Sequence, residues 1–206
     1  MKMSDIAKQY RMVIDVERCI GCHACEVACK QEFEAPLGFF RTMTLYMDTG
    51  NYPKVKREFL PIMCRQCEDA ACLHACTQKA IVDRNGIVMV DSERCNGCGE
   101  CIKACSIGAI YVNPISRIAE KCNLCAHRLE IGMKPACEET CVSDAIQIIE
   151  EKELKRFANA KGFKNAATDK PRTLHINANG IMAQKLRKGH PFSPMNYEIF
   201  TWAVRS

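Results

Sequence analysis

Short apolar runs separated by polar turn residues form the regular pattern of this chain, and their length is typical of strands. The fourth run is interrupted by Asn85 and Gly86, a favoured hairpin turn, and another turn is expected at residues 49–51. No run approaches the about 18 apolar residues of a membrane-spanning helix, so no membrane span is expected. The runs that we expect to form strands are residues 12–16, 45–48, 55–60, 81–88 and 146–149.

The 16 cysteines fall into four groups, and each group ends in x3-Cys. The first and third groups have the spacing C-x2-C-x2-C-x3-C, with which bacterial ferredoxins hold [4Fe–4S] clusters. The second group widens the middle gap to x4 and the fourth widens it to x11. In chain order the groups are Cys19, Cys22, Cys25 and Cys29; Cys64, Cys67, Cys72 and Cys76; Cys95, Cys98, Cys101 and Cys105; and Cys122, Cys125, Cys137 and Cys141.

Internal repeats indicate that one strand–loop–helix unit has been duplicated. The segment from Asp15 to Cys22 recurs from Asp91 to Cys98, with a glycine before the second cysteine both times. That glycine would let the backbone curl closely around a cluster. Three groups continue as Cys-x3-Ala-Ile, which predicts the end of a short helix, a turn and then a strand. The expected fold class is therefore α+β, with two ferredoxin-like (βαβ-type) modules.

Disulfides and zinc are the alternatives to iron–sulfur clusters. A disulfide framework would not require every group to end in x3-Cys. Four-cysteine zinc sites also use C-x2-C pairs, but a longer loop usually separates the pairs. A zinc-stabilised interaction module is therefore the weaker hypothesis, and metal analysis would eliminate it. Because four clusters would replace much of the core, their removal is expected to unfold the protein.

The net charge of the chain bears on whether nucleic acid is an expected partner. The formal charge of +5 treats cysteine as neutral, whereas an oxidised [4Fe–4S] cluster with four thiolates carries about −2. Four clusters would bring the chain to about −3, so the basic residues compensate for clusters. No basic run is interleaved with aromatics, and nucleic acid is not an expected partner. The first residues contain no apolar signal segment, which favours a cytoplasmic location; export alongside a signal-bearing partner stays open.

The ligand sets follow from the rule that the last cysteine of such a group ligates a different cluster. Groups two and three are adjacent and form one pair, which leaves groups one and four as the other. Every set then has four thiolates, so four [4Fe–4S] clusters are expected. The sets are Cys95, Cys98, Cys101 with Cys76; Cys64, Cys67, Cys72 with Cys105; Cys19, Cys22, Cys25 with Cys141; and Cys122, Cys125, Cys137 with Cys29.

The same pairing divides the chain into a cluster domain and an extension. The aromatic insertion would cover a cluster from water or serve as a docking surface. The extension is expected to be helical near residues 151–160 and to wrap over a partner or over the core. The expected parts are a double ferredoxin-like domain (1–150), with an outer module (12–29 and 120–149), an inner module (61–113) and a hairpin insertion (30–60), and the C-terminal extension (151–206).

No enzyme site is expected in the chain itself. Four complete cysteine cages leave no open coordination position, and no catalytic triad, paired-carboxylate motif or phosphate-binding glycine loop occurs. His23, His74 and His127 lie within the cysteine groups. They could tune a cluster through hydrogen bonds or be plain loop residues.

With these residues in view, the chain resembles the four-cluster ferredoxin-like subunits of molybdopterin oxidoreductases, of the dimethyl sulfoxide and polysulfide reductase beta-subunit type. The resemblance rests on the order of the groups, the x4 and x11 gaps, and Tyr52-Pro53 ahead of Leu60-Pro61 and Cys64. It implies a pseudo-twofold pair of modules. It also implies electron transfer to or from a large Mo- or W-pterin catalytic subunit, with a membrane quinone-reactive or flavin subunit as a further partner.

The expected function is therefore the relay of single electrons through four [4Fe–4S] clusters within an oxidoreductase complex. One alternative is a free polyferredoxin that shuttles electrons between soluble enzymes. Another is the partner of a tungsten aldehyde oxidoreductase. The aromatic insertion and the long extension favour a fixed partner over a shuttle.

Overall fold

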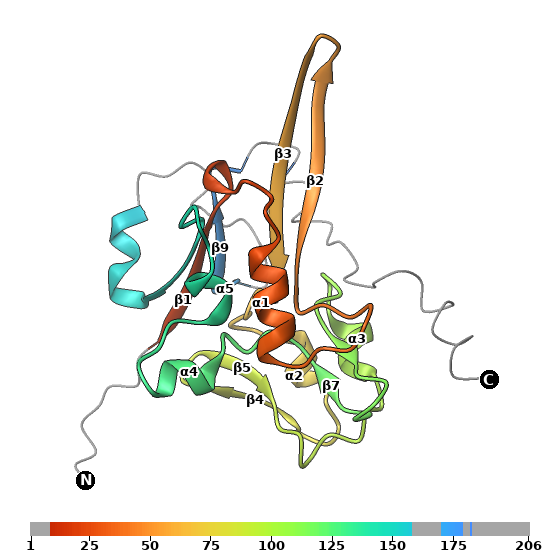
Figure 1. Cartoon of the computed structure of the whole chain (residues 1–206). Coiled ribbons are helices and arrows are strands. Elements are labelled where there is room, and N and C mark those ends of the chain that lie inside the picture. Colours follow the sequence, from red (N-terminus) through yellow and green to blue (C-terminus); the bar gives the residue numbers. More distant parts are fainter. Residues whose placement is uncertain (1–8, 158–169, 179–181, 183–206) are drawn as a thin grey trace, which may run out of the picture.

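The computed structural model describes residues 9–157, 170–178 and 182, and these form a mixed α+β structure of short elements (Figure 1). This agrees with the α+β class expected from the sequence. The described strands form one three-stranded sheet and three two-stranded sheets. The helical segments are η1 (Val16–Arg18), α1 (Ala24–Glu32), α2 (Ala71–His74), α3 (Glu100–Ala104), α4 (Ala126–Glu130), α5 (Ala136–Glu139) and η2 (Glu151–Phe157).

The three-stranded sheet joins the two ends of the cysteine-bearing region. β1 (Tyr10–Asp15) lies in its centre, antiparallel to β8 (Ile146–Glu150) and parallel to β9 (Thr173–Ile176). The strands expected at residues 12–16 and 146–149 are thereby confirmed within one or two residues. β9 was not expected; it belongs to the extension and lies on the core, where Thr173 Oγ1 donates to the Cys64 carbonyl at 3.0 Å.

A long antiparallel hairpin, β2 (Thr42–Asn51) and β3 (Lys54–Met63), projects from the rest of the molecule (Figure 1). Its root is buried, with Leu60 at 0% exposure, whereas Tyr52 at the tip is 92% exposed. The turn expected at residues 49–51 is wrong, because Gly50 pairs with Val55 within the ladder. Proline cannot donate to a ladder, and the chain reverses at Tyr52 and Pro53 instead.

The remaining strands follow the cysteine groups as the repeats predicted. β4 (Ile81–Arg84) and β5 (Ile87–Val90) form a hairpin around Asn85 and Gly86. Both turn residues have positive φ, 54° and 82°, as a type I′ turn requires. β6 (Tyr111–Val112) pairs with β7 (Ala119–Glu120). Each Cys-x3-Ala-Ile segment runs from a short helix to a strand, α2 to β4, α3 to β6 and α5 to β8, which confirms that prediction.

Cysteines are part of the hydrophobic core. The larger cluster of buried side chains includes Met12, Ile14 and Leu60 together with Cys25 and Cys137. A smaller cluster packs Cys101 against residues of β4, β5 and β7. The thiols therefore lie where the elements meet, and the apolar core is thin between them. No helix in the described ranges is long and apolar enough to cross a membrane.

The extension begins with a helical segment, as predicted, but the segment is a 3₁₀ helix and not an α-helix. Glu151–Phe157 forms the 3₁₀ segment η2, within the region expected to be helical. Residues 158–160, the end of that expected helix, lie outside the described residues.

Candidate iron–sulfur sites

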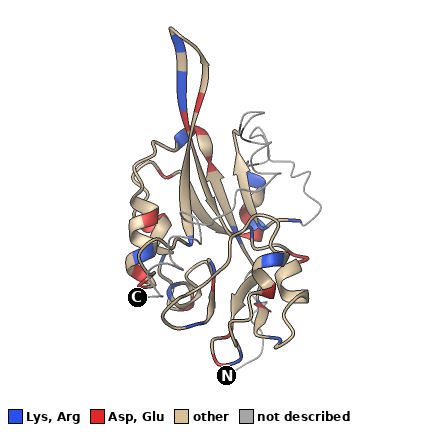
Figure 2. Ribbon diagram, turned by 90° about the vertical axis from the view of Figure 1, so that its right-hand side faces the viewer, with Lys and Arg blue, Asp and Glu red and all other residues tan. Residues whose placement is uncertain are grey.

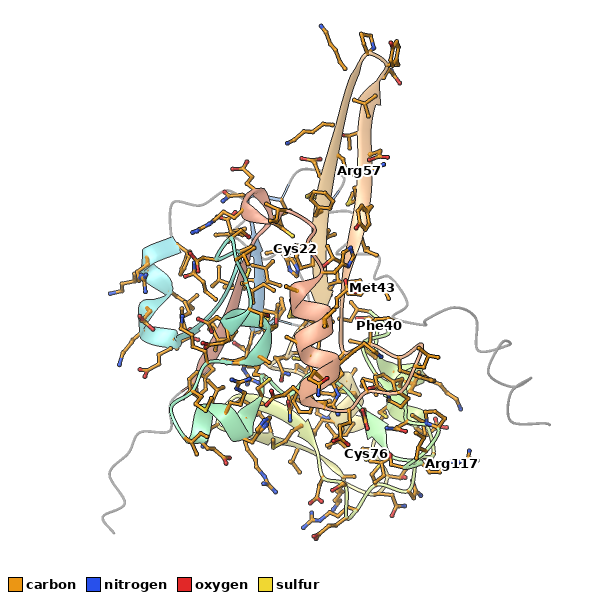
Figure 3. All side chains as sticks on the ribbon, in the orientation of Figure 1. Cys22, Phe40, Met43, Arg57, Cys76 and Arg117 are labelled. Carbon is orange, nitrogen blue, oxygen red and sulfur yellow. The ribbon has the colours of Figure 1, made fainter. Side chains whose placement is uncertain are left out.

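The sixteen cysteines are all free thiols, and all lie in the described part of the chain. Short helices carry the later members of the groups: α1 holds Cys25 and Cys29, α3 holds Cys101 and α5 holds Cys137. Most thiols are buried or half-buried, and Cys22 and Cys98 are the exposed pair. Figure 3 shows Cys22 beside the root of the hairpin and Cys76 at the opposite, lower end of the molecule.

Glycine before the second cysteine is required by geometry in both repeats. Gly21 and Gly97 have φ values of 67° and 70°, a region that other residues rarely adopt. A Cβ atom on Gly97 would lie 2.1 Å from the Arg117 carbonyl oxygen, and one on Gly21 would lie 2.3 Å from the Phe59 ring. The glycines therefore let each loop bend closely against neighbouring protein atoms. That the same bend wraps the loop around a cluster stays a prediction.

Replacing Gly97 with Ala is expected to displace the loop that carries Cys95 and Cys98, since backbone cannot yield at 2.1 Å. The holoprotein should lose one cluster, about four irons, measured by iron analysis. Gly132→Ala is the matched control, because Gly132 also has positive φ, 77°, but nothing lies within 4 Å of its Cβ position. It should cost only about 1–2 kcal/mol and retain all its iron. Equal iron loss in both variants would contradict a steric cause.

Backbone amides support the last cysteine of three groups. In each case the N–H of the alanine four residues later donates to the sulfur, which accounts for the Cys-x3-Ala pattern. The bonds are Ala80 to Cys76 at 3.2 Å, Ala109 to Cys105 at 3.3 Å and Ala145 to Cys141 at 3.2 Å. Cys29 differs because α1 continues past it, and its carbonyl accepts from Phe33 N at 3.2 Å.

Burial keeps several of the cysteine thiols protonated when no iron is bound. It raises the pKa of Cys25 and Cys101 to about 11 and that of Cys72 to about 12. The pKa of Cys137 is raised well above the usual value, again chiefly by burial. Because thiolates are the ligands of iron, cluster binding must release these protons.

Thiols from different groups lie close enough to influence one another. After burial, the neighbours that raise the pKa of Cys29 are Cys122 and Cys125. The structure thus brings group one next to group four, and group two next to group three. Further cross-group neighbours, each secondary to burial, are Cys141 for Cys19, Cys76 for Cys101, Cys105 for Cys72 and, between groups two and four, Cys64 for Cys122.

Three buried or partly buried cations lie near these thiols, and Lys121 is the one without a carboxylate partner among the described residues. Lys121 is 2% exposed, and its Nζ donates to the backbone carbonyls of Val88 and Cys122. Arg41 and Arg128 are ion-paired with Glu120 and Glu32, each at 2.9 Å, although their buried Nε atoms have no hydrogen-bond partner among the described residues. Buried charge is costly unless it is compensated. Four-thiolate clusters of net negative charge would compensate it, so the residues present fit [4Fe–4S] clusters.

The three histidines within the cysteine groups contact carboxylates. His23 contacts Glu26 at 2.9 Å, His74 contacts Asp69 at 2.7 Å and His127 contacts Glu32 at 2.7 Å. Within the described ranges no group of three His, Cys, Asp or Glu side chains is arranged around a single metal ion. In the extension, His175 lies in β9, where its Nε2 donates to the Pro61 carbonyl at 2.7 Å. Burial lowers the pKa of His175 to about 4, so it is neutral at pH 7.

Sequence comparisons identify the same cofactor chemistry. Residues 55–151 match the family model of a 4Fe-4S dicluster domain, and residues 10–31 match a 4Fe-4S binding domain. The thiosulfate reductase electron transfer subunit PhsB of Salmonella typhi is 39% identical over 77% of this chain and 86% of its own length.

Two further relatives are also components of reductases. A tetrathionate reductase subunit of Salmonella typhimurium is 42% identical over 66% of this chain and 56% of that protein. A polysulfide reductase component of Wolinella succinogenes is 37% identical over 68% of this chain and 76% of that protein. The cysteine geometry, the matching domains and these relatives together show that this protein belongs to the [4Fe–4S] electron-transfer subunits of the molybdopterin oxidoreductases.

Proposed function

We propose that this chain relays single electrons through four [4Fe–4S] clusters to or from a Mo- or W-pterin catalytic subunit. The cluster supplies the redox chemistry when bound, because it accepts and donates one electron at a time. The observation that carries the proposal is the pairing of cysteine groups, since each group lies beside its expected partner group.

Four ligand sets are proposed, and the neighbouring thiols support each of them. Set A is Cys19, Cys22, Cys25 and Cys141; set B is Cys29, Cys122, Cys125 and Cys137; set C is Cys64, Cys67, Cys72 and Cys105; and set D is Cys76, Cys95, Cys98 and Cys101. The antiparallel pairing of β1 with β8 supports an outer module from residues 12–29 and 120–149. The β4–β5 hairpin supports an inner module from residues 61–113, related to the outer one by a pseudo-twofold axis.

We infer that the four sets are arranged in the order A, B, C, D. Cys25 of set A influences the pKa of Cys137 in set B, although burial and nearer thiols dominate there. Cys64 of set C follows burial among the causes that raise the pKa of Cys122 in set B. Cys101 of set D has a smaller effect on Cys72 of set C. The exposed thiols, Cys22 and Cys98, belong to the two end sets, so electrons would enter and leave there.

The projecting hairpin supports a fixed partner. Lys54, Lys56 and Arg57 are exposed along β3, and Figure 2 shows the basic residues on its outer half. The nearby Tyr52 is 92% exposed, and an isolated two-stranded ribbon has marginal stability alone. We infer that this hairpin contacts the catalytic subunit. The substrate reaction would take place in that subunit. A membrane quinone-reactive or flavin subunit, and the cellular compartment, stay predictions.

Anaerobic purification of the native complex, followed by metal analysis and identification of the partner chains, tests the proposal. The expected result is about sixteen irons per chain, with molybdenum or tungsten in a co-purifying large subunit. The same iron content without a partner would favour a free polyferredoxin. Zinc in place of iron would eliminate electron transfer.

A further inference from the structure

We propose that Lys121 is a fixed counter-charge shared by the two central clusters, of sets B and C, and that it raises the reduction potential of both. The inference rests on the proposed ligand sets. It assigns a positioning role to a side chain that ligates no iron. Lys121 directly follows β7 and precedes Cys122, the first ligand of set B.

Burial and bonding show that the ammonium group is held without a protein counter-ion. Lys121 is 2% exposed. Its Nζ donates to the Cys122 carbonyl at 2.9 Å and to the carbonyl of Val88 in β5. No carboxylate of the described residues forms an ion pair with it. A buried ammonium bound only to neutral carbonyls would be strongly destabilising, so the compensating negative charge must come from another group.

Residues of both central sets surround Lys121. On one side, the Val88 carbonyl accepts from Lys121 Nζ, and Val88 belongs to the buried cluster against which Cys67 and Cys72 of set C pack. On the other side, the carbonyl of Cys122 in set B accepts from both Lys121 Nζ and Gln66 Nε2, and the backbone N–H of Gln66 donates to the sulfur of Cys64 in set C at 3.5 Å. The ammonium group therefore lies among residues that carry or contact ligands of both central sets.

A cation in this place favours the reduced clusters. Reduction adds one negative charge to a cluster, and Coulomb attraction to a nearby cation is strong in a dry interior. Without Lys121, burial alone would disfavour the added electron and lower the potential. The end sets differ: Cys25 in set A has the carboxylate of Glu26 as its charged neighbour, and the neighbours that raise the pKa of Cys101 in set D after burial are cysteines.

The test is Lys121→Gln in the assembled complex, because glutamine keeps a hydrogen-bond donor but removes the charge. Iron content is measured first, followed by a potentiometric titration monitored by EPR. We expect two of four midpoint potentials to fall, with reduction at least tenfold less favourable, or about 59 mV for one electron. Four unchanged potentials, a fall in only one, or an equal fall in all four would overturn the proposal.

Lys103→Gln is the matched control. Lys103 is a solvent-exposed cation, with 73% of its side chain accessible, beside Cys98 of end set D. Water and salt screen such a charge, so the two central potentials should not move. A shift of those potentials as large as that in Lys121→Gln would overturn the assignment to Lys121.

Lys121→Arg distinguishes charge from fit if Lys121→Gln loses iron. Retention of four clusters by the arginine variant would support a requirement for positive charge. Loss of iron in both variants would overturn the proposal, because the side chain would then serve packing. Wild-type protein without about sixteen irons would instead contradict the proposed function, so the two failures are distinguishable.

Discussion

Removing iron from the holoprotein is expected to unfold the whole chain. The longest described helix, α1, has 9 residues, below the about 12–15 residues that make an isolated helix even marginal. Three of the sheets have two strands, and such sheets are not stable alone. Cys25, Cys64 and Cys137 belong to the main core cluster. Removal of their iron therefore takes cross-links from the place where the elements meet.

Circular dichroism and thermal unfolding measure this effect before and after treatment with a chelator and an oxidant, followed by a thiol reductant. We expect loss of most secondary structure and of the cooperative transition. Protein taken through the same steps without chelator and oxidant is the control. Iron-free protein that keeps its spectrum and melts cooperatively would show that the apolar core suffices by itself.

Replacing Cys105 with Ser is expected to remove or convert the cluster held by Cys64, Cys67 and Cys72, while the cluster of its own group stays intact. The reason is the proposed exchange of last cysteines between groups two and three. Cys105 lies close enough to Cys72 to raise the pKa of its thiol, although burial raises that pKa more. Iron content should fall by up to about four of about sixteen, and the relay should be broken in its interior.

Cys76→Ser is the matched variant, because it should damage the cluster of Cys95, Cys98 and Cys101 instead. EPR of the two variants in the assembled complex separates the outcomes, since different signals should disappear. If Cys105→Ser altered the signal of the Cys95 group, each group would hold its own cluster and the exchange would be wrong.

Features that depend on near neighbours in the sequence were predictable. Asn85 and Gly86 place the β4–β5 turn because their backbones accept positive φ. Gly97 occupies a position with a φ of 70°, which glycine adopts more readily than other residues. The Cys-x3-Ala repeat predicted helix, turn and strand, and the structure adds its cause, an amide–sulfur hydrogen bond.

Two features of the fold were not predicted correctly, the hairpin turn and strand β9. Each depends on partners that are distant in the sequence or on competing local preferences. Gly50 suggested a turn, but it lies inside the ladder with a φ of 89°. A Cβ atom there would lie 2.1 Å from the Lys54 carbonyl oxygen, which explains the glycine. Thr173–Ile176 carries no strand signal strong enough to be expected. It becomes β9 because it pairs with the edge of β1 and because Thr173 Oγ1 donates a hydrogen bond to the Cys64 carbonyl.

The sequence by itself determined the cofactor class, because ligand spacing is a local property of the chain and four cysteine groups suit [4Fe–4S] clusters. It also determined the α+β class, through short runs of strand-forming residues. The tertiary structure alone decided which thiols are exposed, Cys22 and Cys98, and what surrounds Lys121. Exposure and buried charge depend on how distant segments pack, and no local pattern encodes that packing.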